Sequence, residues 1–245
     1  MIPLFKSHFS NGKSILTLNE PEKQKKDGPD SIISIAIENG LKEIFLVEDS
    51  LTGFLAAFKS CQKHNIQLKF GLRITVCNNY DSVESSSHKL ILFALNDQGF
   101  KDINKIYTFA NTEMNGIISN ANLVERLTDN ILMAVPFYDS YIWKNKYTFS
   151  NCMPDFLDNL DVIYFVEDNK LPFDKITGDF IRALHKEKAV EAKTIYYKNR
   201  EDFPAWVTYK IACNRNMGKN QSLSAPELNG CGSKEFCFQS WKEAS

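Results

Sequence analysis

The sequence predicts an α/β fold in which about seven strand–helix units form a distorted barrel within a single domain. Strand-length apolar runs alternate with segments whose apolar residues recur at helical spacing, which is typical of βαβ units and a mostly parallel sheet. The length of 245 residues also fits one large α/β domain better than two small ones. Such barrels carry their functional residues at the carboxyl ends of the strands.

Local patterns predict each element in turn. Apolar residues of segment 31–39 recur at helical spacing, and Gly40 follows as a stop signal. Residues 43–49 form a short apolar run that ends in carboxylates, which is typical of a buried strand. The same criteria predict further strands at 68–76, 89–95, 130–136, 161–167 and 193–197, a last short strand at 235–239, and helices at 53–64, 99–110 and 175–188. Polar segments 18–29 and 78–87 are expected to be loops.

Composition excludes several classes of protein. Lysines and arginines number 29 against 30 aspartates and glutamates, so no general electrostatic case for nucleic-acid binding exists. No apolar run approaches the roughly 20 residues that span a bilayer. The opening residues also lack the pattern of a signal peptide, so we expect a cytoplasmic protein without a membrane partner. The six cysteines include no C-x-x-C pair, which favours buried thiols over a metal ribbon or a disulfide framework.

The segment from His88 to Asn104 (HKLILFALNDQGFKDIN) carries a family resemblance. It resembles the PHP (polymerase and histidinol phosphatase) domain of the bacterial DNA polymerase III alpha subunit. Segments 31–50, 53–71, 115–135 and 232–240 resemble other parts of that domain in the expected order. The resemblance covers almost the whole chain and implies a PHP barrel at residues 1–213. Residues 214–245 would then be an extension that closes the domain toward a polymerase thumb and palm beyond this sequence.

Active PHP domains hold up to three divalent metals with His, Asp and Glu side chains at the strand ends. The resemblance maps those ligand positions, with the register near Val166 uncertain by one residue, onto Lys6, His8, Thr17, Glu48, Asp49, Arg73, His88, Glu167, Thr194 and Tyr196. A guanidinium cannot ligate a metal and an ammonium repels it, so Lys6 and Arg73 indicate a degenerate site. We expect the remaining groups to form a hydrogen-bonded or ion-paired cluster. The alternative is one weak metal site built from His8, Asp49 and His88, with help from Glu48.

The resemblance implies a structural or docking role in DNA replication and no catalysis by this chain alone. The expected partners are the remainder of a C-family DNA polymerase and a proofreading exonuclease subunit, with DNA contacted only indirectly, and no cofactor is expected. The alternative function is a free-standing phosphoesterase or 3′–5′ exonuclease, which would require Mg, Mn or Zn. A third hypothesis is a regulatory binding module that kept the barrel and lost the chemistry.

Other candidate residues are given structural interpretations. His64 and His185 lie in charged helix-end contexts and are expected to be exposed to solvent. The aromatic segment 138–147 could stack on nucleic acid, but such residues more often pack at the edge of a core or on a partner. Cys231 and Cys237 are expected to be thiols, although a disulfide between them is conceivable.

Overall fold

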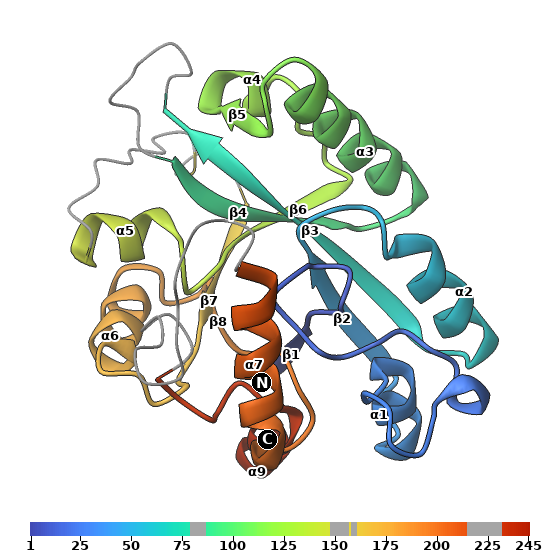
Figure 1. Ribbon diagram of the computed structural model, residues 1–245. Helices are drawn as coiled ribbons and strands as arrows, with labels where there is room; N and C mark the ends of the chain where they lie inside the picture. The colour runs from blue at the N-terminus through green and yellow to red at the C-terminus, as the bar shows by residue number, and fades with distance from the viewer. Residues whose placement is uncertain (79–86, 148–156, 158–160, 215–231) are drawn as a thin grey trace. The chain divides into compact units, whose positions relative to one another are not determined.

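The computed structural model describes residues 1–78, 87–147, 157, 161–214 and 232–245. Its helices and strands confirm the predicted α/β class (Figure 1). The chain divides into two compact units, which are described separately. Unit 1 comprises Met1–Lys69, Glu167–Gly178 and Glu191–Ser245, and unit 2 comprises Phe70–Val166 and Asp179–Val190.

The sheet of unit 1 has β1 (Ile2–Phe5) at its centre. This strand pairs in parallel with β2 (Glu43–Glu48) on one side and with β8 (Ala189–Ile195) on the other. Because all three strands point the same way, their carboxyl ends meet at one edge of the sheet. That edge carries the residues that end or follow each strand, which include several of the candidate site positions.

One helix of unit 1 has a clear N-cap and a clear C-terminal stop. The helix α1 (Ile32–Glu38) begins at Ser31, whose hydroxyl accepts hydrogen bonds from the N–H groups of Ile33 and Ser34. It ends before Gly40, which adopts a positive φ of 65°. The other helical elements are η1 (Pro21–Lys23), α2 (Phe54–Lys63), η3 (Arg200–Asp202), α7 (Phe203–Asn214) and α9 (Phe238–Ala244). Fully buried side chains of this unit include Phe5, Ile33, Leu46, Ile195 and Trp206.

The strands of unit 2 lie in the order β7-β6-β4-β3-β5. Their bounds are β3 (Gln67–Cys77), β4 (Ser87–Ala94), β5 (Ile117–Ser119), β6 (Ile131–Val135) and β7 (Val162–Val166). Strand β4 runs antiparallel to β3 and β6, whereas the β3–β5 and β6–β7 pairs are parallel. The prediction of a mostly parallel sheet did not anticipate the direction of β4. A parallel crossover needs a dozen or more residues, and the chain between Cys77 and Ser87 is shorter than that.

The helices of unit 2 include α3 (Asp97–Thr112), which lies alongside β4 and β6 (Figure 1). The side chain of Asn96 caps α3 by accepting a 2.9 Å hydrogen bond from the N–H of Gly99. A Cβ at Gly99 would lie 2.1 Å from the carbonyl oxygen of Asn130, so only glycine fits there. The remaining helices are α4 (Asn120–Val124), α5 (Tyr141–Tyr147) and α6 (Asp174–Leu184), which begins in unit 1 and continues in unit 2 from Asp179.

Several local predictions were wrong. Segment 235–239 is not a strand: Cys237 makes one isolated bridge with Tyr197, and α9 begins at Phe238. His64 is not free in solvent, because its Nε2 lies 2.8 Å from a Glu20 carboxylate oxygen. His185 stacks on Tyr164, with 3.7 Å between ring centroids.

Other expectations concern the cysteines and the aromatic segment. Cys61, Cys77, Cys213 and Cys237 are free thiols, and all but Cys213 are buried. Cys152 and Cys231 lie outside the described residues. Around segment 138–147, Phe137, Tyr138 and Trp143 pack on one another and Ile142 is buried, as expected for the edge of a core. No helix among the described residues is long and apolar enough to cross a membrane.

Candidate functional site

The carboxyl ends of β1 and β2 bring Lys6, Glu48 and Asp49 together in unit 1. Lys6 follows β1, Glu48 is the last residue of β2, and Asp49 comes next. The Lys6 ammonium lies 3.1 Å from Asp49 Oδ1, and the lysine is only 3% exposed. Lys6 and Asp49 are two of the residues that were predicted to form a hydrogen-bonded or ion-paired cluster.

Glu48 is fully buried, and two serines satisfy its carboxylate. The Ser7 N–H donates to Oε1 at 2.8 Å, and the Ser10 hydroxyl donates to Oε2. Ser10 Oγ also accepts a 3.1 Å hydrogen bond from the N–H of Asp49. Burial raises the pKa of Glu48, while the hydrogen bonds from Ser10 and Ser7 and the charge of Lys6 oppose that rise. Ser10 thus links the Glu48 carboxylate to the backbone of Asp49.

Glu167 follows β7 and is also buried within unit 1. Its carboxylate accepts three hydrogen bonds: from the N–H and the hydroxyl of Thr194, both at 2.8 Å, and from the side-chain amide of Asn169 at 2.9 Å. Burial raises the pKa of Glu167, and these hydrogen bonds and the charge of Lys193 act in the opposite direction. The sequence left the position of this acid at either Val166 or Glu167. The structure places Glu167 beside Thr194, which is another candidate position.

The other candidate positions of unit 1 have structural partners. His8 is exposed, and its ring packs on Phe9 with 4.3 Å between centroids. The Thr17 hydroxyl donates to the carbonyl oxygen of Asp30 at 3.2 Å. Tyr196 stacks between Trp206 and Phe236, at centroid distances of 5.3 and 5.5 Å. An aromatic stack thus lies where the sequence resemblance predicts a family histidine.

Arg73 and His88 belong to unit 2. The Arg73 guanidinium donates to Asp139 Oδ2 at 2.6 Å, and the Arg73 side chain is 9% exposed. Asp139 adopts a positive φ of 61° and accepts a 2.9 Å hydrogen bond at its carbonyl oxygen from the N–H of Lys89. The cation in this ligand position is therefore ion-paired within its own unit.

His88 is fully buried on β4 and packs edge-on against Tyr141, with 5.7 Å between centroids. Its Nε2 has no hydrogen-bond partner among the described residues. Burial, assisted by the charge of Lys144, lowers the pKa of His88 to about 4, against a weak opposing hydrogen bond to the Lys89 carbonyl. The imidazole is consequently neutral at physiological pH.

The donor set does not fit the trinuclear metal centre that the family pattern implies. The Lys6 ammonium lies beside Asp49, and the oxygens of Glu167 already accept three hydrogen bonds. Within the described ranges, no three His, Cys, Asp or Glu side chains are grouped so that they could hold a metal ion.

Comparison with protein families identifies the chain. Residues 25–199 match the model of the PHP domain, which is well over half of the sequence. The chain belongs to the PHP domain family. The family resemblance seen in the sequence is thereby confirmed, together with the α/β class expected for it.

This PHP domain also has a curated relative. The DNA polymerase III subunit alpha of Mycoplasma genitalium is 29% identical to it over 120 residues, which cover 49% of this chain. The matched part spans only 12% of that relative's length. The chain is also similar to a solved structure described as a metal-dependent phosphoesterase from Bifidobacterium adolescentis, with 11% sequence identity and a TM-score of 0.43. The match covers 78% of this chain and 87% of that one. That TM-score is too low to establish more than a loose likeness.

Sequence reasoning missed the groups that complete these clusters. Ser7 and Ser10 hold Glu48, Asn169 holds Glu167, and Asp139 holds Arg73. Serine, asparagine and aspartate are common in loops, so their type alone carried no signal. Their roles emerge only from which strand ends lie side by side.

Proposed function

We propose that this chain is the PHP domain of a DNA polymerase III alpha-like replicative polymerase, and that its degenerate site has a structural rather than a catalytic role. The family match and the curated relative support the connection to the polymerase. The observation that carries the structural role is the contact between the Lys6 ammonium and Asp49 at 3.1 Å. A fixed cation beside the carboxylate supplies the positive charge that a metal would bring.

Two further contacts support the same role. Glu167 has its oxygens engaged by Thr194 and Asn169, and the Arg73 guanidinium is paired with Asp139. Removing one partner from a buried pair leaves an uncompensated charge, so such clusters stabilise the fold only when complete. In this role the domain would serve as a rigid docking element. Its partners would be the remainder of the polymerase, including thumb and palm, and a proofreading exonuclease subunit.

The test combines metal binding with a hydrolysis assay on the purified chain. Calorimetric titration with Mn²⁺ and Zn²⁺ is expected to show no stoichiometric binding, and a chromogenic phosphodiester is expected to remain intact with either ion. The matched variant Lys6→Ala removes the fixed cation and leaves the other residues of the cluster in place. Stoichiometric metal on the unaltered chain, together with hydrolysis that is lost in His88→Ala, would overturn the proposal.

That outcome would support the second candidate, a metal-dependent phosphoesterase or 3′–5′ exonuclease. The observation that favours it is the buried Nε2 of His88, which has no hydrogen-bond partner among the described residues and is an atom type that binds metal ions. Absence of hydrolysis together with co-purification of the chain with a polymerase core would support the docking role instead. A regulatory module acting independently would remain free of polymerase in the same experiment.

A further inference from the structure

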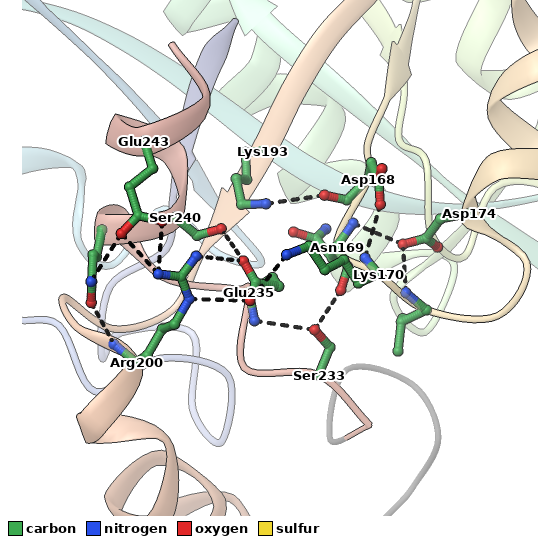
Figure 2. Close-up of polar contacts among 12 residues, drawn as sticks. Asp168, Asn169, Lys170, Asp174, Lys193, Arg200, Ser233, Glu235, Ser240 and Glu243 are labelled. Carbon is green, nitrogen blue, oxygen red and sulfur yellow. Dashed lines mark hydrogen bonds and ion pairs between the residues drawn. The ribbon is translucent and has the colours of Figure 1, made fainter.

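Asn169 joins three segments of unit 1. This fully buried residue donates from its side-chain amide to Glu167 at 2.9 Å and from its backbone N–H to Asp174 Oδ2 at 2.8 Å. Its carbonyl oxygen accepts a hydrogen bond from the Ser233 hydroxyl (Figure 2). One residue therefore connects Glu167, the start of α6 and the segment of residues 232–245, which we call the closing segment.

The closing segment is itself fastened by Arg200. The guanidinium donates Nε to Glu235 at 3.1 Å and one terminal nitrogen to the other Glu235 oxygen at 2.9 Å, which is a bidentate pair (Figure 2). The other terminal nitrogen donates to Glu243 at 2.8 Å. The Ser240 hydroxyl also donates to Glu235. Arg200 holds the pKa of Glu235 at about 2, so the pair stays charged at physiological pH.

The loop 168–174 is held both by hydrogen bonds within it and by contacts from outside it. Lys170 adopts a positive φ of 58°, which a non-glycine residue rarely takes without support. The Lys193 ammonium donates to the carbonyl oxygen of Asp168 at 3.0 Å, from the strand that also carries Thr194. Ser233 holds the next carbonyl along the loop, that of Asn169. The loop is thus fixed by β8 on one side and by the closing segment on the other.

We propose that the closing segment is a strap that positions the Glu167–Thr194 pair. Asn169 is the positioning residue that links docking of the strap to the position of the Glu167 carboxylate. Docking of the strap holds the Asn169 carbonyl through Ser233, and Asn169 in turn holds the Glu167 carboxylate against Thr194. Release of the strap frees the loop and weakens the hydrogen bonds of Glu167. This inference goes beyond the proposed function and holds whether or not the site binds a metal.

The experiment measures amide hydrogen exchange by NMR on the full chain. Ser233→Ala removes the hydroxyl that holds Asn169, and Ser233→Thr keeps a hydroxyl at the same position. In Ser233→Ala we expect exchange at the amides of Asn169 and Thr194 to be at least about fivefold faster, because the local opening that exposes them becomes easier. Ser233→Thr is expected to restore slow exchange and the chemical shift of the Thr194 amide.

Two controls separate the strap from general loss of stability. Lys198→Ala removes ion pairs with Asp30 and Glu38 elsewhere in unit 1, and exchange at Thr194 is expected to stay within about twofold. The amide of Leu92 in unit 2 reports any global unfolding. Slow exchange at Asn169 and Thr194 in Ser233→Ala would overturn the proposal, whether or not the closing segment itself exchanges faster. Equal acceleration at Leu92 would overturn it as well.

Discussion

The carboxylate of Glu167 accepts hydrogen bonds from both the N–H and the hydroxyl of Thr194, each at 2.8 Å. Glu167→Ala would leave these donors and the Asn169 amide unpaired inside the protein. We expect the free energy of unfolding to fall by about 3 kcal/mol, measured by urea denaturation.

Glu167→Gln is the matched control for that substitution. Its side-chain oxygen can accept from Thr194 N–H and Asn169, while its amide donates to the Thr194 hydroxyl, which can turn to accept. Burial disfavours the charge of Glu167, so losing that charge carries little penalty. We expect a change within about 1 kcal/mol. Equal losses in both variants would show that the hydrogen bonds of Glu167 do not stabilise the fold.

The Lys6–Asp49 ion pair gives a second prediction. Lys6→Met leaves the Asp49 charge without this cation and the buried Glu48 without its nearby positive charge. We expect a loss of about 3 kcal/mol in the free energy of unfolding, because one member of a largely buried pair is removed. The double variant with Asp49→Asn is expected to recover part of that loss. Chemical denaturation of the four proteins of the cycle measures the coupling.

Lys63 provides the comparison for Lys6, because it also forms ion pairs, with Glu20 and Glu22, but is about half exposed. Lys63→Met is expected to lower the free energy of unfolding by much less than Lys6→Met does, since water and salt screen exposed pairs. A loss at Lys63 as large as the loss at Lys6 would contradict the view that burial makes the Lys6 pair important.

Because His88 is buried, we expect the folding stability of the protein to depend on pH. Burial lowers its pKa to about 4 from 6.5, so between these values the unfolded chain binds a proton that the folded chain does not. Folding stability should therefore fall as the pH drops from 6.5 to about 4, by roughly 3 kcal/mol at most from this residue. His88→Phe should remove that part of the dependence, whereas His8→Ala, at an exposed site, should keep it. Thermal unfolding recorded across this pH range measures the difference.

Because Gly99 lies close to the backbone of Asn130, we expect any larger residue at this position, at the start of α3, to destabilise the protein. A methyl group there would meet the Asn130 carbonyl oxygen at 2.1 Å, a backbone atom that cannot turn aside. Gly99→Ala is expected to destabilise the protein by about 3 kcal/mol through displacement of α3 from β6. Gln98→Ala, at the neighbouring exposed position, should change stability by less than about 1 kcal/mol. Urea denaturation compares the two, and equal stabilities would refute the close approach.

Local sequence patterns were sufficient for most elements. The run 43–49 predicted β2 (Glu43–Glu48), and segment 99–110 predicted the middle of α3 (Asp97–Thr112). The same reasoning failed at 235–239, where a short aromatic alternation resembles a strand. There, tertiary contacts decide: Glu235 is held by Arg200, Cys237 makes a single bridge with Tyr197, and a helix follows.

The candidate positions were only partly predictable. Their residue types led to the prediction of a degenerate site, because the Arg73 guanidinium cannot ligate a metal and the Lys6 ammonium repels it. Their actual partners were not predictable. Ser7 lies 41 residues from Glu48 along the chain, and Asp139 lies 66 residues from Arg73.

The sequence by itself determined the α/β class and the PHP family. Only the tertiary structure decided which partners the charged groups have. Lys6 pairs with Asp49, Arg73 pairs with Asp139, and Glu167 accepts hydrogen bonds from Thr194 and Asn169. The physical reason is the separation along the chain over which each kind of interaction acts. Periodicity and capping act over a few residues, whereas the partner of a buried charge is set by the order and direction of strands that are distant in sequence.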